Sequence, residues 1–439
     1  MKERGKFHIP WERVNFIADL HIHSRYSRAT SQEMTPPRLN QYARMKGIKV
    51  VGTGDFTHPG YLKELKECLR KGPDGFYHLE DDPDGTRFCL TAEISNIFSW
   101  HGSTRRIHTV IIVSDLKEAE TILGYLRRLG NCSSDGRPIF GFPAKDLVRI
   151  VRDSSDDFLV IPAHIWTPWF SLYGAKSGFD SIEECFEEET EHIFALETGL
   201  SSDPPMNWMW SALDRFTLVS NSDAHSPQKI GREANCFSCE LTQKAMFDSI
   251  RHPDKGMVGT IEFFPEEGKY HWDGHRSCGI ALSPKEAERL QGICPRCGRP
   301  LTMGVMHRAL ALADREEGYV PENALPFEHL VPLSEIIQEA IGVKSFSKRA
   351  KVEYERIVTQ VGSEIEVLTK IPLDDLEGVL SERMLQGISN MRQGRITIKP
   401  GHDGQYGIIR LFSEMGQEKT KKTTGRGPSS GIMRQKTLF

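Results

Sequence analysis

The sequence predicts an α/β protein: a distorted barrel around a largely parallel sheet, then an insert held together by a metal ion and a mostly helical C-terminal part. Three observations predict this class. Short β-rich runs alternate with helical patterns over residues 16–264, metal-ligand types cluster over residues 271–297, and the pattern from Val305 to Glu382 becomes helical. Strand–helix alternation is typical of a parallel sheet, in which the chemistry lies where the strands end.

Length and composition set the outer limits. The chain has 439 residues, 38% of them hydrophobic, which is enough for two or three domains with buried cores. Its 56 Lys and Arg residues against 60 Asp and Glu residues exclude a uniformly basic protein, so any contact with nucleic acid must be local. The N-terminus lacks the apolar region of a signal peptide, and no later stretch is apolar enough to span a membrane. We therefore expect a soluble, unsecreted protein.

The barrel is expected over residues 1–264, and its elements follow from local patterns. Strands are predicted for the β-rich apolar runs at 16–22, 48–55, 106–114, 158–164, 193–200 and 216–225. Helices are predicted for the amphipathic runs at 36–47, 61–72 and 118–130.

Candidate metal ligands recur at the ends of these strands. His21 and His23 are two residues apart, so in a strand they point to one face and can bind one ion together. Further imidazole and carboxylate side chains follow at other strand ends, namely Asp55, His58, Glu93, His108, His164, Asp223 and His225. Six such clusters favour a metal centre over a set of ordinary polar strand ends.

This mixture of donors suits zinc, manganese or iron, and a carboxylate such as Glu93 can bridge two ions. One ion lowers the pKa of a bound water to give hydroxide, while its neighbours neutralise charge on a phosphate ester. We expect two or three zinc ions here, with Mg or Mn as alternatives in catalysis. The catalytic residues are expected to be His21, His23, Glu93 and Asp223.

At these residues the chain resembles the PHP (polymerase and histidinol phosphatase) superfamily over residues 16–262. The resemblance implies a distorted PHP-type (β/α) barrel with a trinuclear metal site, whose ligands here would be His21, His23, Glu93, His108, His164, Asp223 and His225. Two positions depart from the family's pattern. An adjacent Asp-His is replaced by Asp55-Phe-Thr-His58, and Arg28 stands where the family places an Asp. Asp55 is expected to supply the missing oxygen.

Longer segments resemble the endonuclease Q branch of that superfamily. They are PAHIWTPWFSLYGAKSGFDS, SNSDAHSPQKIGREAN, the cysteine-rich insert and MRQGRITIKPGHDGQYGIIRLF. The resemblance implies a DNA repair endonuclease that nicks the backbone 5′ of uracil, hypoxanthine and abasic sites. Xanthine is a further candidate lesion. The partner of this endonuclease would be damaged single- or double-stranded DNA, and no membrane. The protein itself would be cytoplasmic, and associated with the nucleoid when it is bound to DNA. The alternatives are a small-molecule, histidinol-phosphatase-like phosphoesterase and a non-catalytic, clamp-associated DNA-binding scaffold.

The insert, residues 265–303, contains two metal-binding knuckles. His275-Arg-Ser-Cys278 and Cys294-Pro-Arg-Cys297 lie 15 residues apart, the spacing of a zinc ribbon. One structural zinc would fold a segment that lacks a core of its own. His271 competes with His275 as the fourth ligand, and the pair Cys236 and Cys239 is an alternative partner for Cys294 and Cys297.

The loop after His164 is predicted to bind DNA. It carries Trp166, Trp169, Phe170, Tyr173 and Lys176, and its Pro168 and glycines indicate irregular backbone. Aromatic rings beside a phosphoesterase centre can stack on unpaired bases, and a lysine can hold a phosphate. The alternative is a hydrophobic loop packed on the barrel.

Residues 304–412 are predicted to form a helical, DNA-contacting domain that ends in a β-hairpin. Lys348, Arg349 and Lys351, beside Ser345, begin a basic helix that could follow the DNA backbone, although a solvated helix face would look the same. The hairpin surrounds the turn KPGHDGQYG, whose backbone amides could approach a base or a phosphate, a plain hairpin turn being the alternative.

Residues 413–439 are predicted to be a disordered basic tail, with six basic and two acidic residues. The tail ends with Gln435, Leu438 and Phe439, which resemble short peptides that dock on DNA sliding clamps. The Gln would enter a polar pocket and the two apolar side chains a hydrophobic one. A DNA sliding clamp is therefore a predicted partner.

Overall fold

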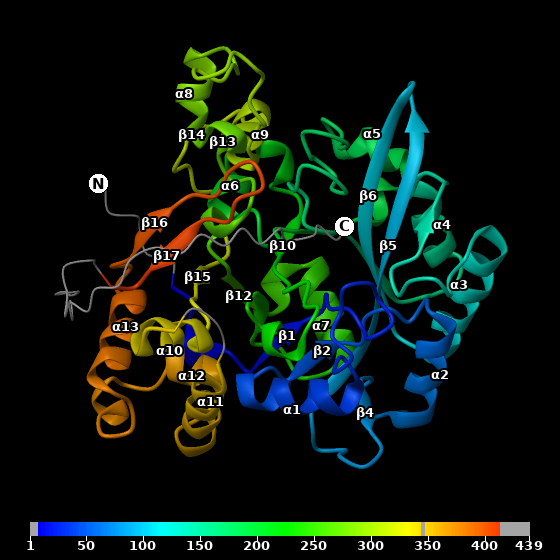
Figure 1. Ribbon diagram of the computed structural model, residues 1–439. Helices are drawn as coiled ribbons and strands as arrows, with labels where there is room; N and C mark the ends of the chain where they lie inside the picture. The colour runs from blue at the N-terminus through cyan, green and yellow to red at the C-terminus, as the bar shows by residue number, and fades with distance from the viewer. Residues whose placement is uncertain (1–7, 344–346, 413–439) are drawn as a thin grey trace, which may run out of the picture.

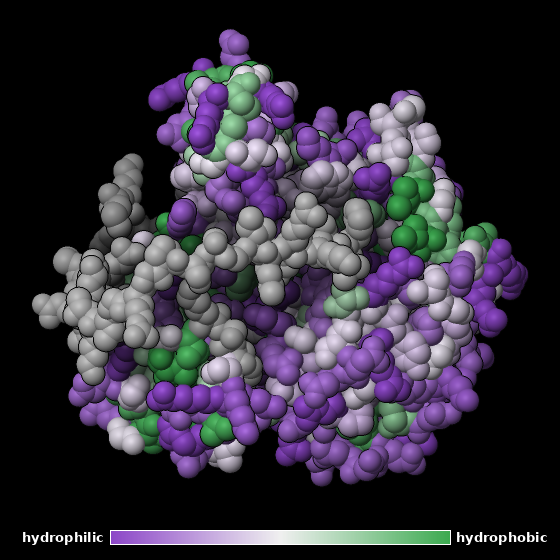
Figure 2. Space-filling view, in the orientation of Figure 1, coloured by the Kyte–Doolittle hydropathy of each residue, from purple (hydrophilic) through white to green (hydrophobic). Residues whose placement is uncertain are grey.

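The structure, a computed structural model, describes residues 8–343 and 347–412. Within these residues one mixed sheet forms the centre of the molecule, and helices cover it or build the C-terminal part (Figure 1). The insert stands as a lobe at the top, and a notch separates it from the long hairpin at the upper right (Figure 2). No helix among the described residues is long and apolar enough to cross a membrane.

Eleven strands among the described residues pair into the main sheet. They are β1 (Phe16–Asp19), β2 (Val50–Gly52), β3 (Leu69–Lys71), β4 (Tyr77–Leu79), β5 (Arg87–Trp100), β6 (Ser103–Val113), β7 (Ile139–Phe140), β8 (Phe158–Pro162), β11 (Ala234–Phe237), β12 (Met257–Glu262) and β15 (Phe327–His329). The order is β15-β12-β11-β1-β2-β5-β4-β3, with β6 and β7 beside β5, and β8 beside β6. Separate pairs are formed by β9 (Ala195–Glu197) with β10 (Thr217–Val219), β13 (Asp273–His275) with β14 (Ile280–Leu282), and β16 (Thr397–Lys399) with β17 (Ile408–Arg410).

The expectation of a largely parallel sheet is wrong, because the sheet is mixed. β1 pairs parallel with β2, β2 with β5 and β12 with β15, but β1–β11, β11–β12, β5–β6 and β6–β8 are antiparallel. Strands β5 and β6 follow each other through a tight turn at His101 and Gly102, whose φ angles are 46° and 78°. A tight turn can join only antiparallel strands, whereas a parallel pair needs a long crossover.

The β5–β6 hairpin positions two candidate ligands. In its register Glu93 faces Val110 and Ser95 faces His108. Glu93 and His108 are therefore diagonal neighbours on one face of the hairpin, within reach of each other. The hairpin extends beyond the rest of the sheet at the upper right (Figure 1).

The helices around the sheet are α1 (Pro36–Lys46), α2 (Pro59–Cys68), α3 (Leu116–Leu129), α4 (Ala144–Arg152), α5 (Ile182–Phe186), α6 (Pro204–Trp208) and α7 (Gln243–Arg251). The predicted helices at 36–47, 61–72 and 118–130 are confirmed, except that Leu69–Lys71 form β3. Local signals account for their ends. Helix α1 starts with two prolines and ends at Gly47 with φ of 84°, and α3 starts with a capping box of Asp115 and Glu118.

Short 3-10 helices lie between these elements. They are η1 (Trp11–Arg13), η2 (Glu187–His192), η3 (Ser211–Leu213), η4 (Pro227–Lys229), η5 (Pro253–Lys255), η6 (Pro265–Glu267), η7 (Arg276–Cys278) and η8 (Asp374–Leu376).

The insert contains β13, η7, β14 and α8 (Pro284–Arg289). The helices that follow are α9 (Val305–Leu312), α10 (Leu333–Ile341), α11 (Lys348–Gln360), α12 (Glu364–Thr369) and α13 (Glu382–Arg392), and the predicted hairpin is β16–β17. Helices α10 to α13 contribute buried Ile336, Ile357, Leu368 and Ile388 to the core. Strand β15 returns to the main sheet beside β12, so the C-terminal part is tied to the barrel through backbone pairing.

Candidate metal centre

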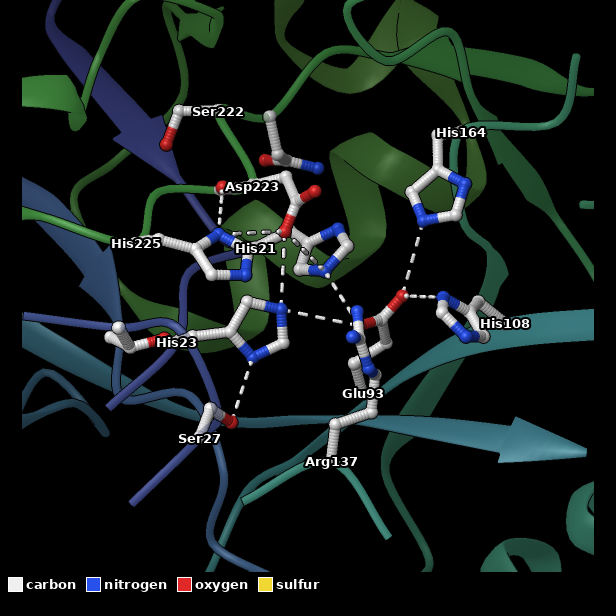
Figure 3. A network of polar contacts seen from close by, with 12 residues as sticks. His21, His23, Ser27, Glu93, His108, Arg137, His164, Ser222, Asp223 and His225 are labelled. Carbon is white, nitrogen blue, oxygen red and sulfur yellow. Dashed lines mark hydrogen bonds and ion pairs between the residues drawn. The ribbon is translucent and has the colours of Figure 1, made fainter. Parts of the chain in front are cut away.

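Side chains from segments that are far apart in the sequence converge on one point (Figure 3). His21 and His23 follow β1, Glu93 lies in β5 and His108 in β6. His164 follows β8, and Asp223 and His225 follow β10. His21, His23, His164, Asp223 and His225 lie in the loops directly after their strands, as predicted. The predicted strand-end position is wrong for Glu93 and His108, which lie within the long strands β5 and β6.

Two groups of candidate ligands share one carboxylate. The ligand atoms of His21, His23, Glu93 and Asp223 lie within 4.8 Å of one another, as do those of Glu93, His108 and His164. The two oxygens of Glu93 face different histidines: Oε2 lies 3.2 Å from His23 Nε2, and Oε1 lies 2.8 Å from His108 Nδ1. Glu93 therefore stands where a carboxylate could bridge two ions.

The state of the inward-facing atoms fits metal ligands. His21 Nε2, His23 Nε2 and Asp223 Oδ1 are buried and make no hydrogen bond with any described residue. Buried polar atoms normally have a hydrogen-bond partner, so a group of such atoms without one needs a different binding partner. Imidazole nitrogens and carboxylate oxygens turned toward one point are the donors that a divalent transition metal ion uses.

Carboxylates hold the other ring nitrogens of the two central histidines. His21 Nδ1 lies 3.0 Å from both carboxylate oxygens of Glu197, and His23 Nδ1 lies 3.0 Å from Asp55 Oδ1. Glu197 is fixed in turn by the His164 backbone N–H and the Asn221 side-chain amide. Contacts of this kind set the tautomer and orientation of a metal-binding histidine, leaving Nε2 free for the ion.

Two sequence predictions need correction here. Asp55 does not face the candidate ions, because its carboxylate is taken up by His23 and by donors from Ser24 and Ser27. His58 does not reach the centre either. Its Nε2 lies 3.1 Å from the Ser133 carbonyl oxygen, and its Nδ1 accepts the N–H of Tyr61 at the start of α2.

His225 lies at the edge of the centre. Its ring centroid is 4.5 Å from that of His23, and its Nδ1 is 2.9 Å from the backbone carbonyl oxygen of Asp223. It belongs to neither ligand group, so the structure does not bring its ring nitrogens together with the ligand atoms of the six residues above. Arg28, which stands where the superfamily has an Asp, forms an exposed ion pair with Asp135.

Sequence reasoning missed Glu197 and Arg137. Glu197 lies inside the predicted strand at 193–200 and is the last residue of β9, so a carboxylate near a strand end was available as a signal. Arg137 lies in a loop without periodicity, and its Nη1 donates to Glu93 Oε2 over 2.9 Å. The loop approaches so closely that a Cβ on Gly136 would lie 2.4 Å from Asp55 Oδ2.

The electrostatics of the centre favour added positive charge. Burial works against ionisation, yet His108 and Arg137 hold the pKa of Glu93 well below its ordinary value. Burial likewise opposes charging of His21, yet Glu197 and Glu93 raise its pKa well above its ordinary value. These buried carboxylates thus attract positive charge strongly, as a cation site must.

Three of the predicted ligands have left-handed backbone. The φ angles are 48° at Asp55, 32° at His164 and 47° at Asp223. Non-glycine residues rarely adopt such angles, and those that do cluster at functional sites.

The aromatic loop divides into buried and exposed members. Trp166 and Tyr173 are buried, and the Trp166 Nε1–H donates to Asn207 Oδ1 over 2.8 Å. Their predicted contact with DNA is therefore wrong, because α6 and the residues after it cover both rings. Trp169 and Lys176 are exposed, and the ring of Phe170 lies 4.8 Å from that of His108.

The insert brings four candidate zinc ligands together. His275, Cys278, Cys294 and Cys297 place their ligand atoms within 4.8 Å of one another. Burial raises the pKa of Cys294, but the backbone N–H groups of Arg296 and Cys297 outweigh it and lower this pKa to about 6. The lowered pKa favours the thiolate that zinc binds. His271 is buried outside this group, and Cys236 is buried in β11.

The remaining predicted contact residues lie elsewhere or outside the described residues. Lys348, Arg349 and Lys351 are exposed at the start of α11, whereas Ser345 is outside the described part of the chain. Gln435, Leu438 and Phe439 are also outside it.

Comparisons with known proteins find related sequences. A family model described as MJ0043 C-terminal domain matches residues 332–395. An uncharacterized protein of Bacillus subtilis, YqxK, is 30% identical over 90% of this chain and 98% of its own length. The uncharacterized protein MJ0043 of Methanocaldococcus jannaschii is 32% identical over 56% of this chain, but that match spans only 31% of MJ0043.

Two solved structures resemble the whole arrangement. The lesion-specific endonuclease PfuEndoQ from Pyrococcus furiosus is 32% identical, with a TM-score of 0.80 over 92% of this chain and 97% of that chain. An endonuclease Q complex with a 27-mer duplex substrate, which has an abasic lesion at the active site, gives the same identity and TM-score over 92% and 98%.

Proposed function

The chain belongs to the endonuclease Q family and is a metal-dependent, lesion-specific DNA repair endonuclease, and we propose that it nicks the backbone 5′ of uracil, hypoxanthine, xanthine and abasic sites. The observation that supports this proposal is the pair of ligand groups that meet at Glu93. Two ions close together can act on the attacking and the leaving oxygen of one phosphodiester.

We assign one ion to His21, His23, Glu93 and Asp223, and the other to Glu93, His108 and His164. Bound zinc-type ions would lower the pKa of the attacking water and neutralise charge on the phosphate. The chain's own residues prepare the site. Glu197 and Asp55 fix the two central imidazoles, and Arg137 offsets part of the negative charge of Glu93.

Lesion specificity is proposed to come from the ease of extruding the damaged base. A deaminated or missing base pairs weakly, so extruding that nucleotide costs less than extruding a normal one. Trp169, Phe170 and Lys176 lie in the aromatic loop after His164, whose Phe170 ring contacts His108, and are assigned to the DNA. Lys348, Arg349 and Lys351 are assigned to the backbone at a greater distance.

Nicking assays on defined duplexes test this function. Labelled duplexes with one uracil, one hypoxanthine, one xanthine or one abasic site are incubated with the purified protein, with and without chelator, beside an undamaged duplex. We expect nicks on the 5′ side of each lesion that leave a 3′-hydroxyl and that chelator abolishes. Asp223→Ala and His21→Ala should abolish nicking while DNA affinity stays largely intact. Cleavage that ignores the lesion, or that persists in both variants, would contradict the proposal.

For the tail we propose a DNA sliding clamp as partner, bound through Gln435, Leu438 and Phe439. Tethering to a clamp would raise the local concentration of DNA without altering the active site.

A further inference from the structure

The turn of the β16–β17 hairpin is docked on the start of the insert by its backbone. The N–H groups of Gly401, Gly404 and Gly407 donate to the carbonyl oxygens of Glu266, Lys269 and Glu267 over 2.8, 2.9 and 3.0 Å. The predicted use of these amides for a base or phosphate is therefore wrong, because the protein itself occupies them. A Cβ on Gly407 would lie 2.0 Å from the Glu266 oxygen, which explains why this turn needs glycine.

This rigid turn nevertheless exposes one large ring. The side chain of Tyr406 is 72% exposed, and Lys269 Nζ lies 4.6 Å from its ring centroid. An exposed ring on a fixed turn adds nothing to the packing of the protein. The exposed ring face of Tyr406 is therefore available for a partner.

A series of ring contacts connects this turn to the metal centre. Tyr270, next to Lys269, has its ring 5.6 Å from that of Trp169, and Trp169 adjoins Phe170, whose ring lies 4.8 Å from His108. The aromatic surface therefore runs from the candidate ligands to the hairpin, over segments that are far apart in the sequence.

Exposed cations without ion pairs lie on the β16–β17 hairpin and on the start of the insert, to which its turn is bound. Within residues 8–343 and 347–412, Lys269, Arg276, Lys399 and Arg410 are exposed and form no salt bridge. Lys399 and Arg410 lie on the outward face of the hairpin, whereas Ile398 and Ile409 between them pack inward. Positive charges of this kind are suited to phosphate groups, and the rings among them to bases.

We propose that Tyr406 stacks on a base of the substrate DNA, with Lys269, Lys399 and Arg410 on the neighbouring phosphates. This proposal rests on the proposed function for its partner, DNA, and adds a contact outside the metal centre. An exposed tyrosine ring with a cation over one face leaves the opposite face for a base, and base stacking tolerates any sequence.

The test compares Tyr406→Ala with Tyr406→Phe, and with Tyr319→Ala as a matched control. Tyr319 is 43% exposed and has Arg315 over its ring at 4.2 Å, but it lies outside the surface described above. Affinity for a uracil-containing duplex is measured by fluorescence anisotropy, with the DNA kept intact by Asp223→Ala. Nicking of the same duplex is measured with the same tyrosine variants in protein that retains Asp223.

We expect Tyr406→Ala to weaken binding and nicking about tenfold, whereas Tyr406→Phe and Tyr319→Ala stay within about twofold of the parent protein. Melting temperatures should be equal, because the ring is exposed. Unchanged affinity in Tyr406→Ala, an equal loss in Tyr406→Phe, or an equal loss in Tyr319→Ala would overturn the proposal. If the parent protein nicks no lesion, the proposed function fails instead, while the dependence of affinity on Tyr406 still decides this inference.

Discussion

Lys46 Nζ lies 2.7 Å from Glu364 Oε2, and both side chains are buried. This pair connects α1 of the barrel to α12 of the C-terminal helices. Glu364 also accepts the hydroxyl of Tyr354 and the backbone N–H of Leu333, over 2.7 and 3.0 Å. One satisfied carboxylate therefore joins α1, α10, α11 and α12.

Removal of the lysine charge should destabilise the protein strongly. Lys46→Met would leave Glu364 buried without its counter-ion, and such a loss costs about 3–5 kcal/mol. Urea unfolding followed by circular dichroism measures the change. The control is Lys63→Met, which removes an exposed pair with Glu67 at 3.8 Å and should cost about 0–1 kcal/mol. Equal effects of the two substitutions would contradict the role given to Lys46.

The carboxylate behind His21 should be needed for metal affinity. Glu197→Gln keeps the shape but weakens the contact that orients the imidazole, so affinity of the barrel site should fall about 10- to 100-fold. Competition with a chromophoric chelator measures this affinity. Glu191→Gln, whose side chain is 77% exposed, is the control and should bind metal like the parent protein. Parent-like affinity in Glu197→Gln would show that His21 needs no such support.

The two kinds of metal site should be separable. Changing Cys294 and Cys297 to Ser should remove one zinc per chain and lower thermal stability, while the barrel retains its ions. Elemental analysis of purified protein gives the metal content. Cys239→Ser tests the alternative pairing and should lose no zinc, because Cys239 lies outside the group formed by the insert. Unchanged zinc in the double variant, or a loss in Cys239→Ser, would refute the assignment.

Deletion of residues 434–439 should abolish binding to the host's sliding clamp and any stimulation of nicking by that clamp. Nicking without the clamp should not change, because the tail is assigned no role in the active site. A pull-down and a nicking assay with added clamp give both answers. Clamp binding as tight as that of the full chain would reject this role for the tail.

The ligands at the strand ends could be predicted from sequence because strand geometry fixes where such side chains point. His21 and His23 need only the period of two to point to one side. Glu93 lies in the middle of β5 and reaches them because β5 is separated from β1 only by β2 in the sheet. The role of Asp55 could not be predicted in this way. Whether its carboxylate faces an ion or the far nitrogen of His23 depends on a left-handed backbone angle that no pattern reveals.

Contacts between distant segments account for the other differences. Arg137 reaches Glu93 from a loop 44 residues later in the chain, where no periodicity indicates a position. Trp166 and Tyr173 are covered by Trp210, whose ring lies 6.2 and 4.9 Å from theirs. Their loop has the composition of a DNA-contacting surface, and only the later segment decides which rings remain exposed.

The left-handed backbone at Asp55, His164 and Asp223 has a consequence for laboratory evolution. Each such residue costs about 1–3 kcal/mol relative to relaxed backbone, and glycine would relieve that cost at any of the three. Each glycine substitution, however, would remove a side chain that is assigned to an ion or that orients a residue assigned to an ion. A library selected for heat resistance alone should therefore enrich glycine at these positions and drift toward inactive protein. Only a selection that also requires nicking should keep the three side chains and gain its stability elsewhere in the chain.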